Sequence, residues 1–149
     1  MNPIRASDVI VQEITIKASA KRIFEALTDP GERVRWWGAE GRFQATHMES
    51  DLRPGGKWTM RGVGMGGKPF SVRGVYREIE RPRLLVFTWI PDWQEDATES
   101  LVRLDLEEKD GATTVRLTHS GLRSESSRAS HRGWPQILAW LQAHVEREV

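Results

Sequence analysis

The stretch from Gly41 to His119 constrains the fold of this chain most, because glycine and proline divide it into short runs of strand-forming residues. Runs of alternating apolar and polar residues between such turn signals are typical of a meandering antiparallel sheet. Asp110-Gly111 lies between the last two runs and is a strong signal for a two-residue hairpin. We expect strands near residues 42–49, 57–62, 70–79, 84–90, 99–107 and 113–119.

Side-chain parity in the last two strands predicts which face of the sheet is buried. Residues two apart in a strand share a face. Val102, Leu104 and Leu106 therefore share one face in the first of these strands, and Val115, Leu117 and His119 share one in the second. The other face should meet water: Arg103, Asp105 and Arg116. A buried histidine most often has a hydrogen-bonded structural role. The inward imidazole could also orient a ligand carbonyl or hydroxyl.

The N-terminal part predicts a further strand and one or two short helices. Val9 to Ile16 partly alternates apolar and polar residues, as a strand does. Ser19 stands where a helix needs an N-cap, and apolar residues follow it at helical spacing: Ala20, Ile23, Phe24 and Leu27. Thr28 to Gly31 should end this helix, and Glu32 to Trp37 could add one or two turns.

The C-terminal part predicts an amphipathic helix. Its apolar residues recur at helical spacing: Trp134, Ile137, Leu138, Leu141 and Val145. Pro135 complicates the start, because proline is tolerated in the first turn of a helix and otherwise bends it. We expect a helix from about residue 126 that bends near Pro135, and a start at Trp134 is the alternative. With the strands, these helices predict a single α+β domain over residues 1–149.

Charge and composition exclude several classes of partner. The 22 basic and 21 acidic residues are interspersed, which indicates neither a nucleic-acid nor an anionic-membrane partner. Without cysteine, the chain has no disulfide, no cysteine-ligated zinc and no thiol nucleophile. It also has no apolar run near the roughly 20 residues that span a bilayer, and its N-terminus lacks the apolar core of a signal peptide. We therefore expect a cytoplasmic protein.

Three motif-like patterns do not support a nucleotide or metal site. Gly62 to Gly67 fits the letters of GxGxxG, but another strand-like run follows it, so we interpret it as a hairpin loop that could form a lip over a cavity. His47-Met48-Glu49 has the spacing of half a deaminase motif and lacks the paired cysteines. His131 and His144 are too far apart to share a helical face as a ligand pair. We expect no metal and no cofactor.

Six short strings occur in an order that resembles one family: Trp36-Trp37-Gly38, Arg53-Pro54-Gly55-Gly56-Lys57-Trp58, Gly74-Val75-Tyr76-Arg77-Glu78-Ile79, Arg83-Leu84-Leu85-Val86-Phe87-Thr88-Trp89, Thr118-His119-Ser120-Gly121-Leu122 and Gly133-Trp134. From residue 8 to residue 147, the chain resembles the bacterial single-domain relatives of the Hsp90 ATPase activator C-terminal domain, within the START-like superfamily. The resemblance implies a helix-grip fold, in which a sheet of about seven strands wraps around the last helix and leaves a cavity for ligands such as lipids, hormones or polyketides. The eukaryotic activator has an additional N-terminal domain that contacts the chaperone. These 149 residues leave no room for one, which argues against co-chaperone activity.

Tryptophan is unusually frequent, with seven tryptophans against one tyrosine. Large rings with a single polar N–H indicate either extensive buried surfaces or an aromatic-lined pocket. In a helix-grip fold, inward side chains would line the ligand cavity: Trp58, Met60, Tyr76, Phe87, Trp89, Val102, Leu104, His119, Trp134, Leu138 and Leu141. The sequence leaves open whether the same residues simply form the core.

We expect non-catalytic binding of a small hydrophobic molecule, because no recognisable catalytic set is present. One alternative is a cyclase or dehydratase in which Tyr76, His119 or an inward carboxylate moves a proton. Two converging titratable groups, one with a strongly shifted pKa, would favour it. Another alternative is a chaperone-interacting or other protein-binding module, which an exposed apolar patch over a filled cavity would favour. The sequence decides neither the ligand, nor the pathway, nor whether the chain forms a homodimer.

Overall fold

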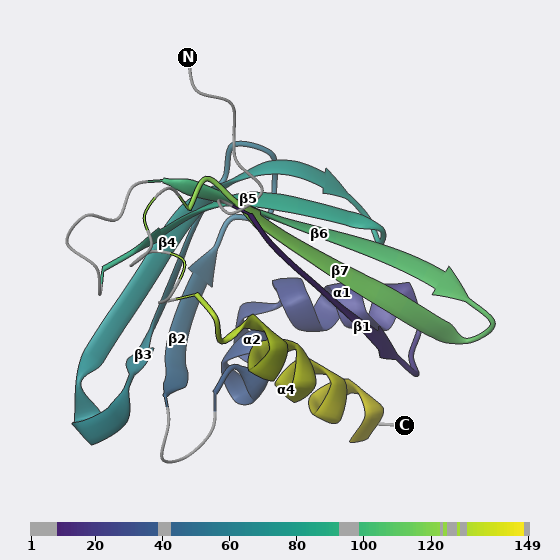
Figure 1. Cartoon of the computed structure of the whole chain (residues 1–149), viewed down its shortest axis with the longest axis horizontal. Helices are drawn as coiled ribbons and strands as arrows, with labels where there is room; N and C mark the ends of the chain where they lie inside the picture. Colours follow the sequence, from purple (N-terminus) through teal and green to yellow (C-terminus); the bar gives the residue numbers. More distant parts are fainter. Residues whose placement is uncertain are drawn as a thin grey trace.

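Seven strands form one antiparallel sheet in the order β1-β7-β6-β5-β4-β3-β2, in a computed structural model that describes residues 9–38, 43–92, 99–122, 124, 128 and 131–147. The strands are β1 (Ile10–Ile16), β2 (Gln44–Ser50), β3 (Lys57–Val63), β4 (Pro69–Glu80), β5 (Leu84–Pro91), β6 (Ser100–Lys109) and β7 (Ala112–Ser120). The sheet is curved, and the helices lie on its concave side (Figure 1). They are α1 (Ala20–Thr28), α2 (Pro30–Trp36) and α4 (Trp134–Arg147). This α+β architecture confirms the expected sheet around a C-terminal helix.

The strand predictions are confirmed, since each strand lies within two residues of its expected bounds. At the expected hairpin, Lys109 pairs with Ala112 across the turn. Asp110 and Gly111 both have positive φ, 54° and 81°, and aspartate and glycine enter this region more easily than most residues. A turn of this kind matches the twist of the two strands that it joins.

Parity in β6 and β7 is also confirmed. The side chains expected to face inward are all buried: Val102, Leu104, Leu106, Val115, Leu117 and His119. On the opposite face, Arg103 and Arg116 are exposed and Asp105 is half-buried. The inward face of the sheet therefore forms one wall of the core.

Two short helices follow β1, as expected, and Asp29 joins them. Ser19 caps α1 by accepting a hydrogen bond from the Arg22 backbone N–H at 3.1 Å. Asp29 ends α1 through its own backbone N–H and caps α2 through its carboxylate, which accepts from the Glu32 N–H at 2.9 Å. Pro30 occupies the first turn of α2, where its missing N–H costs no hydrogen bond.

Glu32 on α2 contacts both of the other helices. Its carboxylate on α2 forms an ion pair with Arg22 on α1, and His144 Nε2 on α4 lies 2.9 Å from Glu32 Oε1. Burial acts to raise the pKa of Glu32, but the hydrogen bonds from Arg22 and His144 outweigh burial and lower the pKa below 4.5. The carboxylate is therefore charged at neutral pH, which strengthens these contacts between helices.

The long C-terminal helix begins at Trp134, the alternative start that the sequence allowed, and not near residue 126. Arg128, within the earlier stretch, is itself helical, and its backbone N–H donates to the Ser124 carbonyl oxygen at 3.1 Å. His131, Arg132 and Gly133 form a turn, so Pro135 falls in the first turn of the helix and causes no bend there. Residues 125–127, 129 and 130 of the expected helix lie outside the described residues. The buried face of α4 consists of Trp134, Leu138, Leu141 and Val145, and Ile137 beside it is half-buried.

The glycine-rich string, Gly62 to Gly67, lies in a hairpin, as expected from the sequence. Val63 at the end of β3 pairs with Pro69 at the start of β4. A single 3-10 turn, Met65–Gly67, fills the loop between them. This arrangement is not the helix opening after a parallel strand that a dinucleotide-binding motif needs.

Among the described helices, none is both long and apolar enough to cross a bilayer.

Candidate functional site

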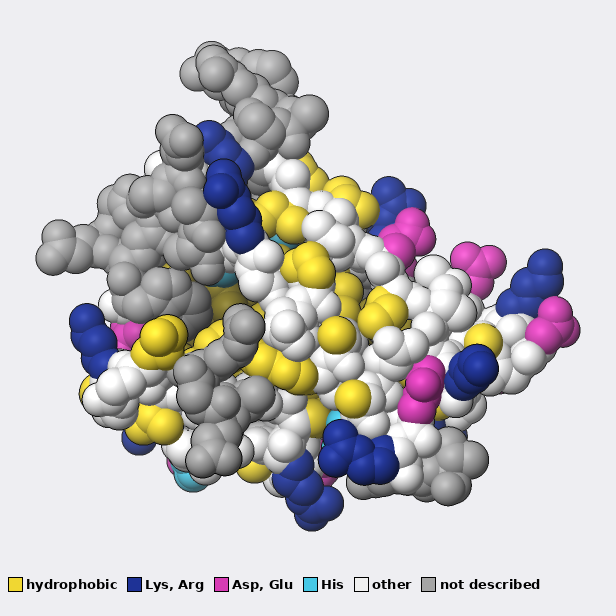
Figure 2. Space-filling view, turned by 60° about the horizontal axis from the view of Figure 1, so that its bottom comes forward, with side chains coloured by type: hydrophobic (Ala, Val, Ile, Leu, Met, Phe, Trp, Pro, Cys, Tyr) yellow, Lys and Arg dark blue, Asp and Glu magenta, His cyan; other side chains and the backbone are white. Residues whose placement is uncertain are grey.

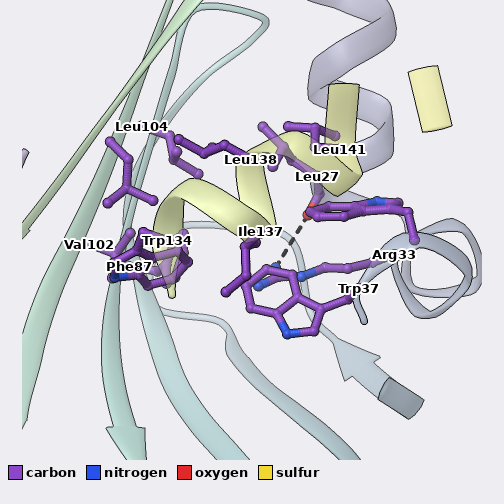
Figure 3. A pocket seen from close by; sticks show the side chains of 12 residues that line it. Leu27, Arg33, Trp37, Phe87, Val102, Leu104, Trp134, Ile137, Leu138 and Leu141 are labelled. Carbon is purple, nitrogen blue, oxygen red and sulfur yellow. Dashed lines mark hydrogen bonds between the residues drawn. The ribbon is translucent and has the colours of Figure 1, made fainter. Parts of the chain in front are cut away.

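The space between the sheet and α4 is the place where a ligand was expected, and side chains fill most of it (Figure 3). The free volume that remains is about 10 Å³, roughly the room that one water molecule needs. Six of the expected site residues line it: Phe87, Val102, Leu104, Trp134, Leu138 and Leu141. The other five are buried in the same core but do not line it: Trp58, Met60, Tyr76, Trp89 and His119.

Tryptophan rings occupy much of the interior. Five of the seven form one connected cluster: Trp36, Trp37, Trp58, Trp89 and Trp134. Neighbouring ring centroids in it lie 5.2 to 6.2 Å apart. Trp140 packs apart from this cluster on Phe43, with centroids 5.4 Å apart, and Trp93 lies outside the described residues. The tilted and edge-on rings gain both apolar burial and ring-to-ring attraction, so in this closed form they act as core.

His119 joins β7 to β6 and α4 through both of its ring nitrogens. Trp134 Nε1 donates to His119 Nδ1 at 3.0 Å, and His119 Nε2 lies 2.7 Å from Ser100 Oγ. Since Nδ1 accepts, the ring proton must be on Nε2, and Ser100 can then donate to the Trp89 carbonyl oxygen at 3.2 Å. This chain of hydrogen bonds satisfies the imidazole, so the geometry fits a structural role for His119.

Two imidazoles meet at this point, because the ring centroids of His119 and His131 are 4.8 Å apart. Burial, together with the nearby His131, lowers the pKa of His119 to about 3. A group that takes up a proton only near that pH is a poor general base at neutral pH. His131 Nε2 in turn accepts a hydrogen bond from Trp89 Nε1 at 2.9 Å. The pair therefore suits the packing of the core better than proton transfer.

Arg33 is the feature of the interior that apolar packing does not explain. It lies on α2, only 3% of its surface is exposed, and it lines the remaining free volume. Its hydrogen bond runs from Nη1 to the Leu27 carbonyl oxygen at 3.3 Å, and the buried Nε has no hydrogen-bond partner. Figure 3 shows the guanidinium between Leu27 and the indole of Trp37.

Aromatic rings surround the Arg33 guanidinium where a carboxylate would be expected. Its Cζ lies 4.6 Å from the centroid of Trp37, and two further rings, Trp58 and Phe87, are within 5.9 Å. Across the described ranges, no acidic side chain forms an ion pair with it. Burial lowers the pKa of Arg33 to about 10, so the side chain is still charged at neutral pH.

The surrounding rings compensate only part of the cost of this burial. One cation–π contact contributes about 0.5–2 kcal/mol, whereas removing a charged group from water costs several kcal/mol even after the protein relaxes. A guanidinium has five N–H donors and no acceptor. The unsatisfied donor can therefore be paired only by an acceptor that the described residues of this closed form do not supply.

Trp58 supplies a second unpaired donor nearby. Its indole Nε1 is buried and, like Arg33 Nε, has no hydrogen-bond partner. Its ring packs edge-on against Phe87, with centroids 5.4 Å apart. The only tyrosine hydroxyl, on Tyr76, is already paired with Ser50 Oγ at 2.7 Å. The site thus has free donors and suits a ligand that offers acceptors.

Sequence reasoning missed Arg33 and Trp37, although a signal for them was present. Arg33, Trp36 and Trp37 stand at i, i+3 and i+4 in the segment expected to form one or two helical turns. That spacing places all three on one helical face, so an arginine shares the face that buries two tryptophans. The charge of arginine made it a weak candidate for a core position.

The side chains that the structure places do not form a metal site, since no three histidine or acidic residues among them converge.

Comparison with known proteins agrees with this architecture. The sequence matches the family model described as Activator of Hsp90 ATPase homolog 1-like protein over residues 17–146. No curated protein matches the sequence.

Several bacterial proteins of known structure are similar to this chain. Protein CV1439 from Chromobacterium violaceum is 22% identical, with a TM-score of 0.83 over 93% of this chain and 97% of that chain. For NE0264 from Nitrosomonas europaea, the identity is 16% and the TM-score 0.82, over 97% of this chain and 98% of that one. CalU16 from Micromonospora echinospora is 24% identical, with a TM-score of 0.69 over 94% and 77% of the two chains. At these identities the likeness shows the helix-grip fold alone.

Proposed function

This chain belongs to the family of Activator of Hsp90 ATPase homolog 1-like proteins, and we propose that it binds a small hydrophobic or amphipathic molecule between the sheet and α4 without catalysing a reaction. The observation that carries the proposal is an apolar, aromatic interior with buried donors that nothing in the described chain satisfies, on Arg33 and Trp58. Ligand sites commonly combine an apolar lining with a few such polar atoms.

The ligand would enlarge the interior as it binds. An empty apolar cavity is costly, because the groups that line it lose contacts, so a ligand-free chain is expected to close on itself. Ile137 on α4 lines the space and is only half-buried. We expect its side chain to move most. The work of opening lowers the apparent affinity for the ligand.

The enzyme alternative has weaker support. The two buried titratable groups that meet are His119 and His131, and both already serve the hydrogen bonds of the core. Tyr76 is paired with Ser50 on the neighbouring part of the sheet. A catalytic role would require one of these groups to leave its partner.

A protein-binding role is the second candidate, because the interior is nearly filled. Figure 2 shows the molecule turned so that the helix side comes forward, with hydrophobic side chains near the middle and most charged ones toward the edge. The exposed large hydrophobic residues, however, lie on separate elements: Val11 on β1, Leu101 on β6, and Val63 and Met65 at the β3–β4 hairpin. That scatter favours a docking surface less than a contiguous patch would.

Native mass spectrometry of freshly purified protein tests the proposal first, through the mass of a copurified small molecule. Titration with neutral apolar compounds such as decanol tests it second, because a ligand in the interior should change the fluorescence of the tryptophan cluster and raise the melting temperature. Trp37→Phe should reduce the fluorescence change, and Trp140→Phe, outside the cluster, should preserve it. If no compound of a broad panel gives a saturable change in either signal, the protein-binding role should replace this one.

A further inference from the structure

We propose that the ligand of this site is an apolar molecule with a carboxylate or similar oxyanion, and that Arg33 binds the oxyanion with Trp58 as a second donor. This inference rests on the proposed function, since it assigns a chemical class to the ligand of the same interior. It differs from that function in predicting a strong preference for acids over neutral or cationic molecules of equal size.

Arg33 is built into the interior and does not reach out of it. α2 carries it on the same face as Trp36, whose indole N–H donates to the Ala26 carbonyl oxygen at 2.9 Å and fixes α2 against α1. The Arg33 stem is therefore held by a rigid pair of helices. Its own hydrogen bond, to the carbonyl oxygen of Leu27, leaves the Nε donor buried without a partner.

The surroundings of this cation discriminate between ligand classes by charge. Within the part of the chain that the structure covers, no carboxylate neutralises the Arg33 charge, and the closest rings offer only their faces. A cationic ligand would place a second positive charge in a medium of low dielectric, where like charges repel strongly. A neutral alcohol could accept one hydrogen bond but would leave the charge unbalanced. An oxyanion both balances the charge and accepts hydrogen bonds, which are strongest when both groups are ionised.

Trp58 offers a second hydrogen-bond donor to the oxyanion beside Arg33. Arg33 Cζ lies 5.6 Å from the Trp58 ring centroid, so the two side chains that carry unpaired donors are neighbours in the core. The side chain of Trp58 lies over Gly74 on the neighbouring strand, where even a Cβ atom would approach the indole nitrogen to 2.7 Å. Only a glycine at this position leaves room for the Trp58 indole where it lies, so Gly74 helps to set the position of this donor.

The apolar part of the ligand follows from what surrounds the charge. Trp37 covers one side of the guanidinium, and Ile137 and Leu138 of α4 line the same space. Apart from Arg33, the side chains that line this space are aliphatic or aromatic, so the part of the ligand beyond its oxyanion must be apolar to be buried there. An alkyl or aryl monocarboxylate fits this requirement, whereas a sugar or a free phosphate does not.

Three ten-carbon probes separate these classes: decanoate, decanol and decylammonium, each used below its micelle concentration and followed by tryptophan fluorescence. We expect decanoate to bind about tenfold or more tightly than decanol, the effect of one charge-assisted hydrogen bond, and decylammonium to bind most weakly. Arg33→Met, which keeps the stem and removes the charge, should abolish the preference for decanoate and retain decanol binding. Arg35→Met on the exposed face of the same helix is the control and should leave the preference unchanged.

The outcomes separate this inference from the function on which it rests. Equal binding of the acid and the alcohol overturns the inference and leaves the function standing, and no binding of any probe overturns both. A preference for decanoate that survives Arg33→Met also overturns the inference, because the acid then binds elsewhere. Trp58→Phe should weaken decanoate binding several-fold and leave decanol binding unchanged.

Discussion

Protonation of His119 should destabilise the fold between neutral pH and about pH 3, and the size of the effect follows from its surroundings. Burial beside His131 lowers the pKa of His119 from 6.5 to about 3. The unfolded chain therefore binds a proton below pH 6.5 that the folded chain refuses until about pH 3. The stabilisation due to this group is complete above pH 6.5 and is lost as the pH falls.

The expected loss is large enough to measure. Each pH unit between the two pKa values costs about 1.4 kcal/mol, so the free energy of unfolding should fall by about 2 kcal/mol between pH 7 and pH 5. A typical domain has only about 5–15 kcal/mol in total. Glu32 does not add to the loss of stability between pH 7 and pH 5. Its pKa is lowered below 4.5 in the folded chain, so the stability that its charge contributes is lost only in more acidic solution.

Urea unfolding at pH 7 and pH 5, followed by circular dichroism, measures this loss. His119→Gln should be less stable than the wild type at pH 7, because the hydrogen bonds to Ser100 and Trp134 are disturbed, yet it should lose about 2 kcal/mol less between the two pH values. His47→Gln, whose native side chain is 54% exposed, is the control and should keep the wild-type dependence. If the wild type and His119→Gln lose the same free energy, His119 does not stay neutral in the folded state and the reasoning is refuted.

Three further predictions concern the helices. Glu32→Gln should lower the free energy of unfolding by about 1–3 kcal/mol, because Arg22 and His144 lose a charged acceptor; the exposed Glu25→Gln is its control, and equal melting temperatures of the two variants would contradict it. Deleting residues 133–149 should abolish cooperative melting, since losing a single buried Leu or Trp already costs about 2–5 kcal/mol; a truncated chain that still melts cooperatively would refute the role of α4 in the core. Arg33→Met should raise the melting temperature of the ligand-free protein by removing an unbalanced buried charge, and a lower melting temperature would mean that the ring contacts outweigh its desolvation.

Local patterns in the sequence were sufficient to predict the strands and most of the helices. Glycine and proline divide the sheet region into its strands, and Asp110-Gly111 can adopt the positive φ values that its hairpin needs. Parity correctly placed the His119 side chain in the interior, because strand geometry repeats every two residues whatever the strand packs against. The start of α4 was predicted less well, since a proline is compatible with either a first turn or a bend.

The hydrogen bonds of the interior, and whether it is open or filled, depend on contacts between residues far apart in sequence. The partners of His119 are Ser100 on β6 and Trp134 on α4, and no periodicity relates those positions. Likewise, an apolar inner face indicates burial but not whether the space behind it is open or filled.

The sequence by itself determined the sheet, its inward face and the helix that covers it, because each depends on repeats within a few residues. Only the tertiary structure decided that side chains, among them three of the clustered tryptophans, close the interior to about 10 Å³ and that Arg33 is buried there with no carboxylate of the described residues paired to it. The volume left between a curved sheet and a helix is a small difference between the size of that space and the summed volumes of the side chains that enter it. Such a difference depends on how all of these side chains pack together, and the pattern along any one strand does not contain it.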